Sequence, residues 1–503
     1  MSEGSTKRVA KNTIIMYIRM IVLMCISFYA SRLLLKTLGV EDYGIYSVVG
    51  SISSSFVAIK SLFSESIQRF LNVAKGKSNN SLAEQIEIFN LSILAHIVLM
   101  AIFILVVEII GMWLLYNKLS IPEGRFDAAV WVLQMTIIST AISIISIPYD
   151  AVIIANEKMG FYAIISIIDG LLKLVFVLVL PVLGFDYLKE YSTLLVLIPF
   201  STLVIQLIYV RRFPECKFQT KYNKSLFKEI MSLSSWNFVG NICFSLIHEG
   251  INMLLNVFGG VVSNAARAIA YQVKGVTGLL SSNTMVAVRP VVMQQSVQKS
   301  NSQYFKVINL ISRISFFFFF LPVIPLIVYC PQLLGLWLGE VPENAALFTR
   351  LILIGLLIRS LHEPINIMNM AFGRIKRMMY IESSLMVGCL LLVYASLSIT
   401  GYIWIPFAIM SLMELFIIVA LVLNANKELG FSGRLYIKEV GFPLLLLSVF
   451  SGVIGTLFLF YVQPNNVFSL IIWSITLAII IIGLCLCFMN KTERGIVLKI
   501  LKK

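Results

Sequence analysis

Charged residues are scarce in this chain. Asp, Glu, Lys and Arg together make up 13% of its 503 residues, whereas hydrophobic residues make up 59%. Soluble domains carry about 25% charged and about 45–50% apolar residues. Because the apolar excess continues along the whole chain, the composition excludes a large soluble domain. It predicts a membrane protein that crosses the bilayer many times.

Sequence motifs of cofactor and metal chemistry are also missing. The seven cysteines are scattered, without a CxxC pair or a Cys/His cluster. This pattern indicates neither a disulfide framework nor a zinc site. Gly76-Lys77-Ser78 resembles the end of a phosphate-binding loop, but Leu71 stands where that motif needs its first glycine. We therefore expect no cofactor and no metal.

Catalytic signatures are absent as well. The sequence contains no HExxH, no GxSxG and no EF-hand loop, and only three histidines. The predicted outer loops are short, whereas a membrane glycosyltransferase or polymerase would carry a sizeable loop with catalytic side chains. We therefore expect a transporter and not an enzyme. An integral-membrane glycosyltransferase is the less favoured alternative.

Long apolar runs are what the sequence has in abundance. Fourteen runs are each close to the roughly 20 residues that a helix needs to cross a bilayer. Only Thr400-Gly401-Tyr402 separates the two closest runs. The expected fold class is an all-α polytopic membrane protein with about 14 transmembrane helices. The predicted spans run at about 13–37, 45–70, 88–116, 127–152, 160–182, 190–210, 231–258, 266–290, 308–331, 346–371, 378–400, 402–424, 438–462 and 466–490.

The first six spans resemble the next six. Leu34-Leu35 and Gly39 recur as Leu254-Leu255 and Gly259, an offset of 220 residues. Further matches at offsets of 216 to 220 are Arg69 with Arg289, Pro148 with Pro364, Tyr162 with Tyr380, Ser166 with Ser384 and Gly170 with Gly388. We interpret them as two copies of one six-helix bundle in the same orientation, an arrangement found in secondary transporters.

The repeat predicts the domain organisation. Spans 1–6 form an N-lobe at 1–210, and a cytoplasmic linker follows at 211–229. Spans 7–12 form a C-lobe at 230–425. Spans 13 and 14 with a basic cytoplasmic tail make up 426–503. Two lobes of this kind are expected to face a central cleft.

With fourteen spans, successive loops lie on alternate sides of the membrane. The basic residues are distributed unevenly between these two sides. One side holds 26 of the Lys and Arg residues and the other side six: Lys36, Lys118, Arg125, Lys189, Arg267 and Arg350. The positive-inside rule therefore predicts that both termini are cytoplasmic. The first span is expected to insert as a signal anchor, without a cleaved signal peptide. The net charge of +15 is read as this orientation signal, and nucleic acid is not an expected partner.

The remaining eight cations fall inside the spans: Arg19, Arg32, Lys60, Arg69, Lys173, Lys274, Arg313 and Arg359. A charge in the hydrocarbon region costs about 2.5–3.5 kcal/mol on insertion scales, so such charges usually face a cavity. The deepest are Lys60, Lys274 and Arg359. These three, with Arg19 and Lys173, are the predicted substrate-binding cations. Arg313 lies close to a span end, where we expect its side chain to reach the interface.

Acidic side chains inside the spans are candidates for ion coupling. They are Glu65, Glu249 and Glu414, together with His248, an imidazole able to take up or release a proton beside Glu249. Glu363 stands four residues after Arg359, the spacing at which two side chains pair on one helix face. Pairs of this kind can also be purely structural.

Spans 1, 2, 7 and 8 are rich in polar residues. Ser51, Ser53 and Ser64 lie in span 2, and Asn252 and Gln272 are examples from spans 7 and 8. Helices facing lipid would not tolerate this density, so we expect these spans to line a hydrophilic cleft. Part of the polar content can instead hold helices together. With its excess of cations, the cleft suits an anionic ligand such as a diphosphate.

Several segments resemble a known family. Leu38-Gly39 followed by Tyr43-Gly44-Ile45-Tyr46 matches the turn after the first span of the polysaccharide flippases in the multidrug/oligosaccharidyl-lipid/polysaccharide (MOP) exporter superfamily. The runs at 7–13, 66–70 and 155–158 are also similar to this family. The number of spans and the two-lobe repeat extend the resemblance to this family over the whole chain.

The resemblance implies a function. The Wzx-like members of this family move undecaprenyl-diphosphate-linked oligosaccharide across the bacterial inner membrane for surface polysaccharides such as O-antigen of lipopolysaccharide or capsule. The resemblance further implies that membrane lipid is a partner. It also implies that a polysaccharide polymerase and glycosyltransferases act in the same pathway. Because the sequence has no ATP-binding motif, we expect the energy to come from an ion gradient (H⁺ or Na⁺), from the membrane potential or from consumption of the product. The alternatives are a MATE-like drug exporter and a lipid II flippase. The sequence leaves the sugar, the pathway, the coupling ion and the oligomeric state undetermined.

Overall fold

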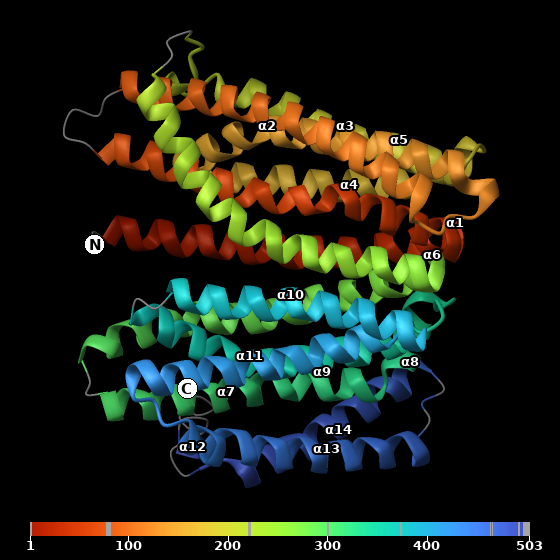
Figure 1. Cartoon of the computed structure of the whole chain (residues 1–503), viewed down its shortest axis with the longest axis vertical. Helices are drawn as coiled ribbons and strands as arrows, with labels where there is room; N and C mark the ends of the chain where they lie inside the picture. The colour runs from red at the N-terminus through yellow and green to blue at the C-terminus, as the bar shows by residue number, and fades with distance from the viewer. Residues whose placement is uncertain are drawn as a thin grey trace. The chain divides into compact units, whose positions relative to one another are not determined.

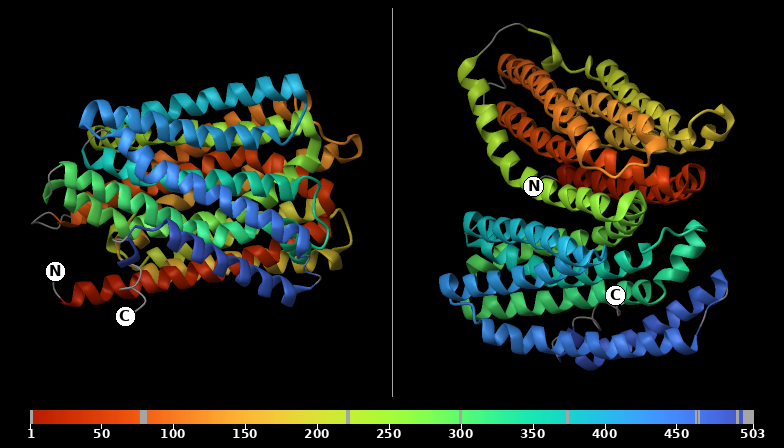
Figure 2. Two further views of the ribbon diagram at one scale, coloured as in Figure 1. Left: turned by 90° about the horizontal axis from the view of Figure 1, so that it is seen from below. Right: turned by 45° about the vertical axis from the view of Figure 1, so that its right-hand side comes forward.

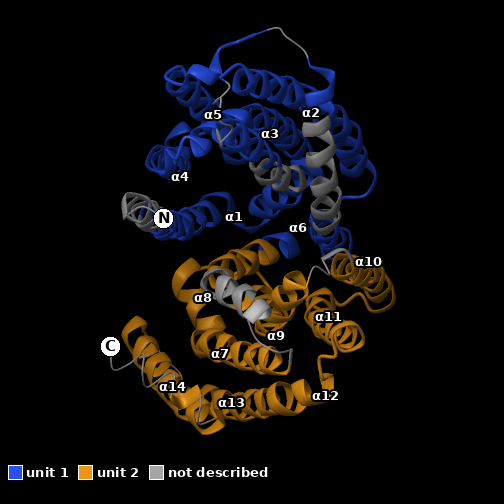
Figure 3. Ribbon diagram, turned by 90° about the vertical axis from the view of Figure 1, so that its left-hand side faces the viewer, with its two compact units in different colours: residues 1–265 blue, residues 266–503 orange. Residues whose placement is uncertain are grey.

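The computed structural model describes residues 3–76, 82–219, 223–298, 301–372, 375–462, 464, 466–490 and 493–495. Most of these residues are helical, and none of them forms a strand. They divide into two compact units, Met1–Ala265 and Ala266–Lys503, which are shown in different colours in Figure 3. The lobe boundaries expected from the sequence, at 210, 229 and 425, stay a prediction.

The first unit is a bundle of long helices that run side by side (Figures 1 and 2). Helix α3 lies at its centre and contacts α1, α2 and α5. The helices are α1 (Glu3–Gly76), α2 (Leu82–Asn117), α3 (Phe126–Ala155), α4 (Met159–Leu183), α5 (Tyr187–Val210) and the first part of α6 (Lys224–Gln298). Two short 3₁₀ turns, η1 (Glu123–Arg125) and η2 (Pro214–Cys216), lie between them.

The second unit repeats this plan and adds a pair of helices. Helix α9 contacts both α7 and α11, whereas α13 and α14 pack on α7. The elements are the rest of α6, α7 (Asn301–Val328), α8 (Cys330–Leu338), α9 (Ala345–Ala371), α10 (Ile375–Thr400), α11 (Ile405–Leu429), α12 (Gly433–Tyr436), the π-helical turn η3 (Ile437–Gly441), α13 (Phe442–Tyr461) and α14 (Val467–Phe488).

The predicted fold class is confirmed. Twelve helices in the described residues are long and apolar enough to cross a membrane. Helices α1 and α6 each contain two of the predicted spans, which accounts for the fourteen. The closest pair of spans is also separated as expected, since Gly401 adopts φ +68° between α10 and α11. The other predicted spans agree with the helices to within a few residues.

Two glycines bend the two longest helices. Gly39 in α1 has φ 77° and ψ 173°, and Gly260 in α6 has φ 65° and ψ −176°. Both are conformations that glycine adopts at no steric cost and that other residues avoid. The sequence repeat paired Gly39 with Gly259, so the structure places the second bend one residue later. The same bend at matching places supports the two-copy interpretation of the sequence.

Residues just after the Gly39 bend make close contacts, which explains the turn motif physically. Tyr43 is buried, and the Tyr46 ring meets the Tyr191 ring edge to face with centroids 5.3 Å apart. Gly44 lies against α6 so closely that an added Cβ would be 2.0 Å from the carbonyl oxygen of Val261. Only a residue without a side chain fits there.

Buried asparagines surround the second bend. The Asn256 amide nitrogen donates to Oδ1 of Asn264 at 2.9 Å, and the Asn264 amide nitrogen donates to Oδ1 of Asn252 at 2.9 Å. The backbone N–H of Ser120 donates to Asn256 Oδ1 at 2.7 Å. These three asparagines are at most 1% exposed. This part of the polar content of span 7 therefore holds helices together.

An ion-pair cluster connects three helix ends in the first unit. Arg125 donates from Nε to Asp42 Oδ1 at 2.8 Å and from Nη1 to Asp186 Oδ2 at 2.7 Å. Asp186 also accepts from the backbone N–H groups of Leu188 and Lys189 and so caps α5. Partial burial acts to raise the pKa of Asp186, but Arg125 and the two N–H groups outweigh burial and lower that pKa. The cluster joins α1, α3 and α5.

A second cluster surrounds the turn η2. The Lys75 ammonium lies 3.1 Å from Glu215 Oε1 and donates to Asn156 Oδ1 at 2.8 Å. The Asn156 amide donates to Glu215 Oε1 at 2.7 Å. Burial acts to raise the pKa of Glu215, which is 3% exposed, but Asn156 and Lys75 outweigh burial and lower it. The cluster connects α1, the end of α3 and the segment after α5.

Candidate functional site

A network of five ionisable side chains crosses three helices of the second unit. It consists of Arg359, His362 and Glu363 on α9, Glu382 on α10 and Glu414 on α11, and we call it the α9–α11 charge network. Arg359 lies midway along α9, a helix with a mean hydropathy typical of a membrane span. Ionisable groups at this depth are costly unless they are paired, and they mark functional sites by default.

Arg359 is at the centre of the network. Its Nη1 donates to Glu414 Oε1 at 3.1 Å, and its Nε lies 3.6 Å from Glu363 Oε1. The pairing with Glu363 confirms the i,i+4 contact that the sequence spacing indicated. The guanidinium side chain is 37% exposed, and that of Glu414 is 17% exposed. The ion pair is therefore partly open and not sealed in a core.

His362 lies between two carboxylates. Its Nε2 is 3.0 Å from Glu382 Oε1, a hydrogen-bonding distance, and its Nδ1 is 3.6 Å from Glu414 Oε2. The imidazole is only 2% exposed. Glu414 thus faces Arg359 with one oxygen and His362 with the other. A proton on the imidazole would interact favourably with both glutamates.

The charges of the network do not balance. Three carboxylates face one guanidinium, so the network carries two negative charges when His362 is neutral and one when it is protonated. An excess of negative charge among partly buried side chains within a membrane span attracts a proton or a small cation. Among the described residues, no group of three or more His, Cys, Asp or Glu side chains is arranged to hold a metal ion. The chemistry that the geometry offers is proton uptake and release between Glu414, His362 and Glu382.

The structure joins two residues that the sequence placed in different roles. Arg359 is a predicted substrate-binding cation and Glu414 a predicted ion-coupling acid, and they form one ion pair between α9 and α11. Neither role is tested by the pairing itself. The pairing does mean that any change in the charge of Glu414 alters the electrostatic environment of Arg359.

The predicted residues of the first unit lie on other helices. Arg19 on α1 donates to the hydroxyl of Ser166 at 3.3 Å, and its guanidinium lies 5.1 Å from the Tyr162 ring centroid. Lys173 on α4 is exposed. His248 and Glu249 are partly exposed on α6. Their proposed roles stay predictions.

Lys274 lies in the part of α6 that belongs to the second unit. Its ammonium is 4.6 Å from the centroid of the Tyr271 ring, a distance at which a cation is attracted to an aromatic face. The side chains of Lys60 and Glu65, the other two candidates, lie outside the described residues.

Sequence reasoning missed two members of the network and misplaced one other arginine. His362 and Glu382 carried no signal beyond their position inside an apolar run. Arg313, expected to reach the interface, is instead 3% exposed. It pairs with Glu493 and donates to the carbonyl oxygens of Glu439 and Phe488, at 2.6 Å each. Its partners lie far along the chain, so spacing alone could not reveal them.

Comparisons with known proteins identify the fold. No family model matches the sequence, and no curated protein matches it. Solved structures do match. The lipid II flippase MurJ in an inward closed conformation superposes with a TM-score of 0.67 at 14% identity. The match covers 96% of this chain and 100% of that chain.

Multidrug transporters match over a smaller part of the chain. An inward-facing multidrug resistance MATE family transporter of the MOP superfamily superposes with a TM-score of 0.64 at 12% identity, over 82% of this chain and 98% of that one. A MATE structure in complex with MaD3S gives a TM-score of 0.55 at 12% identity, over 84% and 96%. At these identities the likeness shows the fold. This chain has the fold of MOP-superfamily transporters and is a multi-pass membrane protein.

Proposed function

We propose that this chain is a flippase. It moves undecaprenyl-diphosphate-linked oligosaccharide repeat units across the bacterial inner membrane for surface polysaccharide synthesis. The observation that carries the proposal is the full-length match to the fold of a flippase, which covers 96% of this chain against 82% for the MATE transporter. The turn motif at Leu38-Gly39 and Tyr43-Gly44 supports the polysaccharide branch. Both termini are proposed to lie in the cytoplasm.

The proposed mechanism is alternating access. The cations Arg19, Lys60, Lys173, Lys274 and Arg359 attract the diphosphate and head group, while the prenyl tail stays in lipid. Such cations suit a diphosphate because ionised donors make the strongest hydrogen bonds to phosphate oxygens.

The ion pair between Arg359 and Glu414 links the substrate to the coupling ion. When Glu414 is ionised it neutralises Arg359, and when Glu414 takes up a proton the guanidinium becomes available to a phosphate. Glu382 and His362 provide neighbouring sites for that proton. His248, Glu249 and Glu65 are further coupling candidates. An H⁺ gradient is therefore the favoured energy source, with Na⁺ as the alternative.

A lipid II flippase is the second candidate function, because the matched flippase is one for lipid II. Both substrates are lipid-linked sugars, and they differ in the sugar moiety. The decisive experiment deletes the gene, labels the lipids that are accessible from each side of the membrane, and then extracts and identifies them.

The four possible outcomes are distinct. Complete diphosphate-linked repeat units on the cytoplasmic leaflet, with loss of surface polysaccharide, are expected. Accumulation of lipid II would favour the second candidate. Truncated oligosaccharides would point to a transferase, and no change in these pools would favour a drug exporter. Re-expression of the wild-type chain is the control and should restore the surface polysaccharide.

A further inference from the structure

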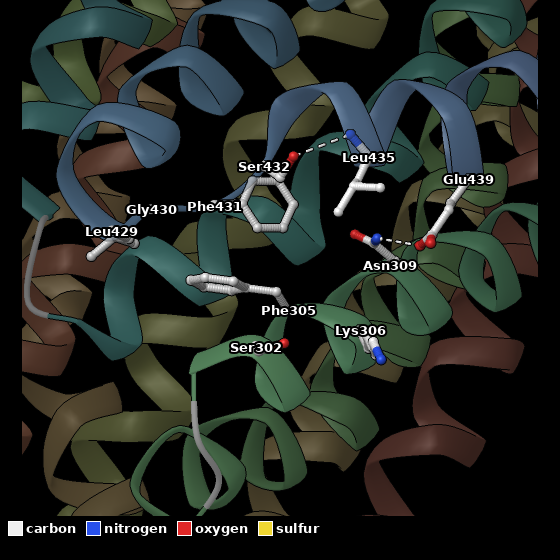
Figure 4. Close-up of a pocket in the computed structure, with 10 residues that line it drawn as sticks. All are labelled: Ser302, Phe305, Lys306, Asn309, Leu429, Gly430, Phe431, Ser432, Leu435 and Glu439. Carbon is white, nitrogen blue, oxygen red and sulfur yellow. Dashed lines mark hydrogen bonds between the residues drawn. The ribbon is translucent and has the colours of Figure 1, made fainter.

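A pocket of about 360 Å³ opens on the second unit, away from the α9–α11 charge network. It lies between the start of α7, the turn after α11 and the segment formed by α12 and η3 (Figure 4). This segment connects the repeated helices to α13 and α14. The residues that determine its chemistry are Phe305, Lys306, Asn309, Phe431, Leu435 and Glu439.

Asn309 presents a hydrogen-bond acceptor to the pocket. Its side chain is 7% exposed, and its Nδ2 donates to Glu439 Oε2 at 2.8 Å. This bond leaves Oδ1 directed toward the other lining side chains, as Figure 4 shows, and without a donor. An unsatisfied buried acceptor is unfavourable. A ligand with an N–H or O–H group could donate the hydrogen bond that Asn309 Oδ1 lacks.

Two opposite charges also line the pocket. Lys306 and Glu439 are both exposed, and no ion pair between them is formed among the described residues. Lys306 supplies an ammonium for an anionic group, and Glu439 supplies a carboxylate for a cationic group. A ligand that carries both charges would satisfy both side chains at once.

The remaining walls are apolar. The Phe305 and Phe431 rings pack edge to face with centroids 5.2 Å apart. Leu435, Ile437 and Phe442 continue along α12, η3 and the start of α13 with exposures of 52%, 63% and 58%. In a membrane-spanning unit, such an exposed apolar strip suits acyl chains. The pocket thus combines a polar site for a zwitterion with a surface for hydrocarbon.

We propose that this pocket binds a phospholipid whose head group carries a primary ammonium, of the phosphoethanolamine class. The ammonium donates to Asn309 Oδ1 and pairs with Glu439, while the phosphate pairs with Lys306. The acyl chains lie along Leu435 and Ile437. The bound lipid holds the α12–η3 segment against α7, next to the contact of Arg313 with the Glu439 carbonyl. This inference does not depend on the flipped substrate.

The test uses the purified full-length protein, stripped of lipid and titrated with defined lipids. Phosphatidylethanolamine is compared with phosphatidylcholine, since the trimethylated head group has no N–H to donate. Bound lipid is counted by native mass spectrometry. We expect phosphatidylethanolamine to bind about tenfold more tightly than phosphatidylcholine. This ratio corresponds to about 1.4 kcal/mol, which a hydrogen bond from a charged donor contributes.

Variants locate the site. Glu439→Gln should reduce the preference, because Glu439 pairs with the ammonium. Lys306→Gln should weaken the binding of both lipids, because both carry the phosphate that Lys306 pairs with. Both residues are exposed, so the variants should fold. Arg434→Gln changes a nearby exposed cation that does not line the pocket and should leave the preference intact. Equal binding of the two lipids by the wild-type protein would overturn the proposal, and so would an unchanged preference in Glu439→Gln together with unchanged affinity in Lys306→Gln. So would tight binding of water-soluble glycerophosphoethanolamine, since the ligand would then not need its acyl chains.

Discussion

Arg359 donates a hydrogen bond from Nη1 to Oε1 of Glu414 at 3.1 Å, across the interface of α9 and α11. A guanidinium and a carboxylate at this distance are stabilised by each other, and each would be costly alone within a membrane. The same glutamate faces His362 with its second oxygen. The pair therefore places a potential substrate ligand and a potential proton acceptor in direct contact.

Removing the guanidinium tests the proposed role of Arg359. In Arg359→Ala the diphosphate loses one charged partner, so we expect translocation to fall about tenfold or more. Membrane abundance should stay near the wild-type level, because Glu414 can take up a proton when it is unpaired. Surface polysaccharide and protein abundance are measured in the same cells. Lys427→Ala, which changes an exposed cation at the end of α11, is the control.

Lys60→Ala should behave in the same way if Lys60 also binds the head group. Wild-type translocation in both Arg359→Ala and Lys60→Ala would rule out the proposal that these cations bind the head group of the substrate.

Exchange of His362 for glutamine tests the proton pathway. His362→Gln keeps a polar side chain beside Glu382 and Glu414, but the glutamine side chain cannot be protonated as an imidazole can. We expect transport in vesicles to lose its response to an imposed pH gradient. His96→Gln is the matched control, since His96 is similarly buried and donates one hydrogen bond from Nδ1 to the carbonyl oxygen of Ser92. An unchanged response in His362→Gln would remove this histidine from the coupling scheme.

Glu215 should make stability depend on pH. Its pKa is lowered in the folded state from an ordinary value of 4.5, because Asn156 and Lys75 outweigh the effect of burial. The carboxylate therefore stabilises the fold above about pH 4.5, and this contribution is lost as pH falls through the lowered pKa. Glu215→Gln should cost about 1–3 kcal/mol at pH 7.

Thermal unfolding of the purified protein across pH measures this effect. The difference in Tm between wild type and Glu215→Gln should be largest at neutral pH and should shrink in acid. Glu123→Gln replaces an exposed carboxylate and should show no such difference. A Tm difference that is the same at every pH would mean that Glu215 contributes by packing and not by its charge.

Gly44 should tolerate no side chain. An added Cβ would lie 2.0 Å from the Val261 carbonyl oxygen, so Gly44→Ala must separate α1 from α6. We expect a loss of at least about 3 kcal/mol and little protein in the membrane. Gly50→Ala on the same helix meets nothing within 4 Å and should be neutral or slightly stabilising. Normal abundance and Tm of Gly44→Ala would contradict the close approach of the two helices.

The sequence by itself determined where the chain forms membrane-spanning helices. A membrane span needs about 20 consecutive apolar residues, which is a local property of the chain. Each of the fourteen predicted runs therefore overlaps a helix, and α1 and α6 each contain two of the runs. Glycine at 39 and at 401 marked a bend and a turn, because both positions have positive φ. The repeat matched Gly39 with Gly259, whereas the structure places the second bend at the adjacent Gly260.

Only the tertiary structure decided which charged residues meet. Glu414 is 55 residues from Arg359, and Glu493 is 180 residues from Arg313. No periodicity connects residues so far apart, because their contact depends on how helices pack. The i,i+4 pair of Arg359 with Glu363 could be predicted, since both lie on one helix face. Pairing within one helix follows from its geometry, whereas pairing between helices follows from the free energy of the whole packed unit.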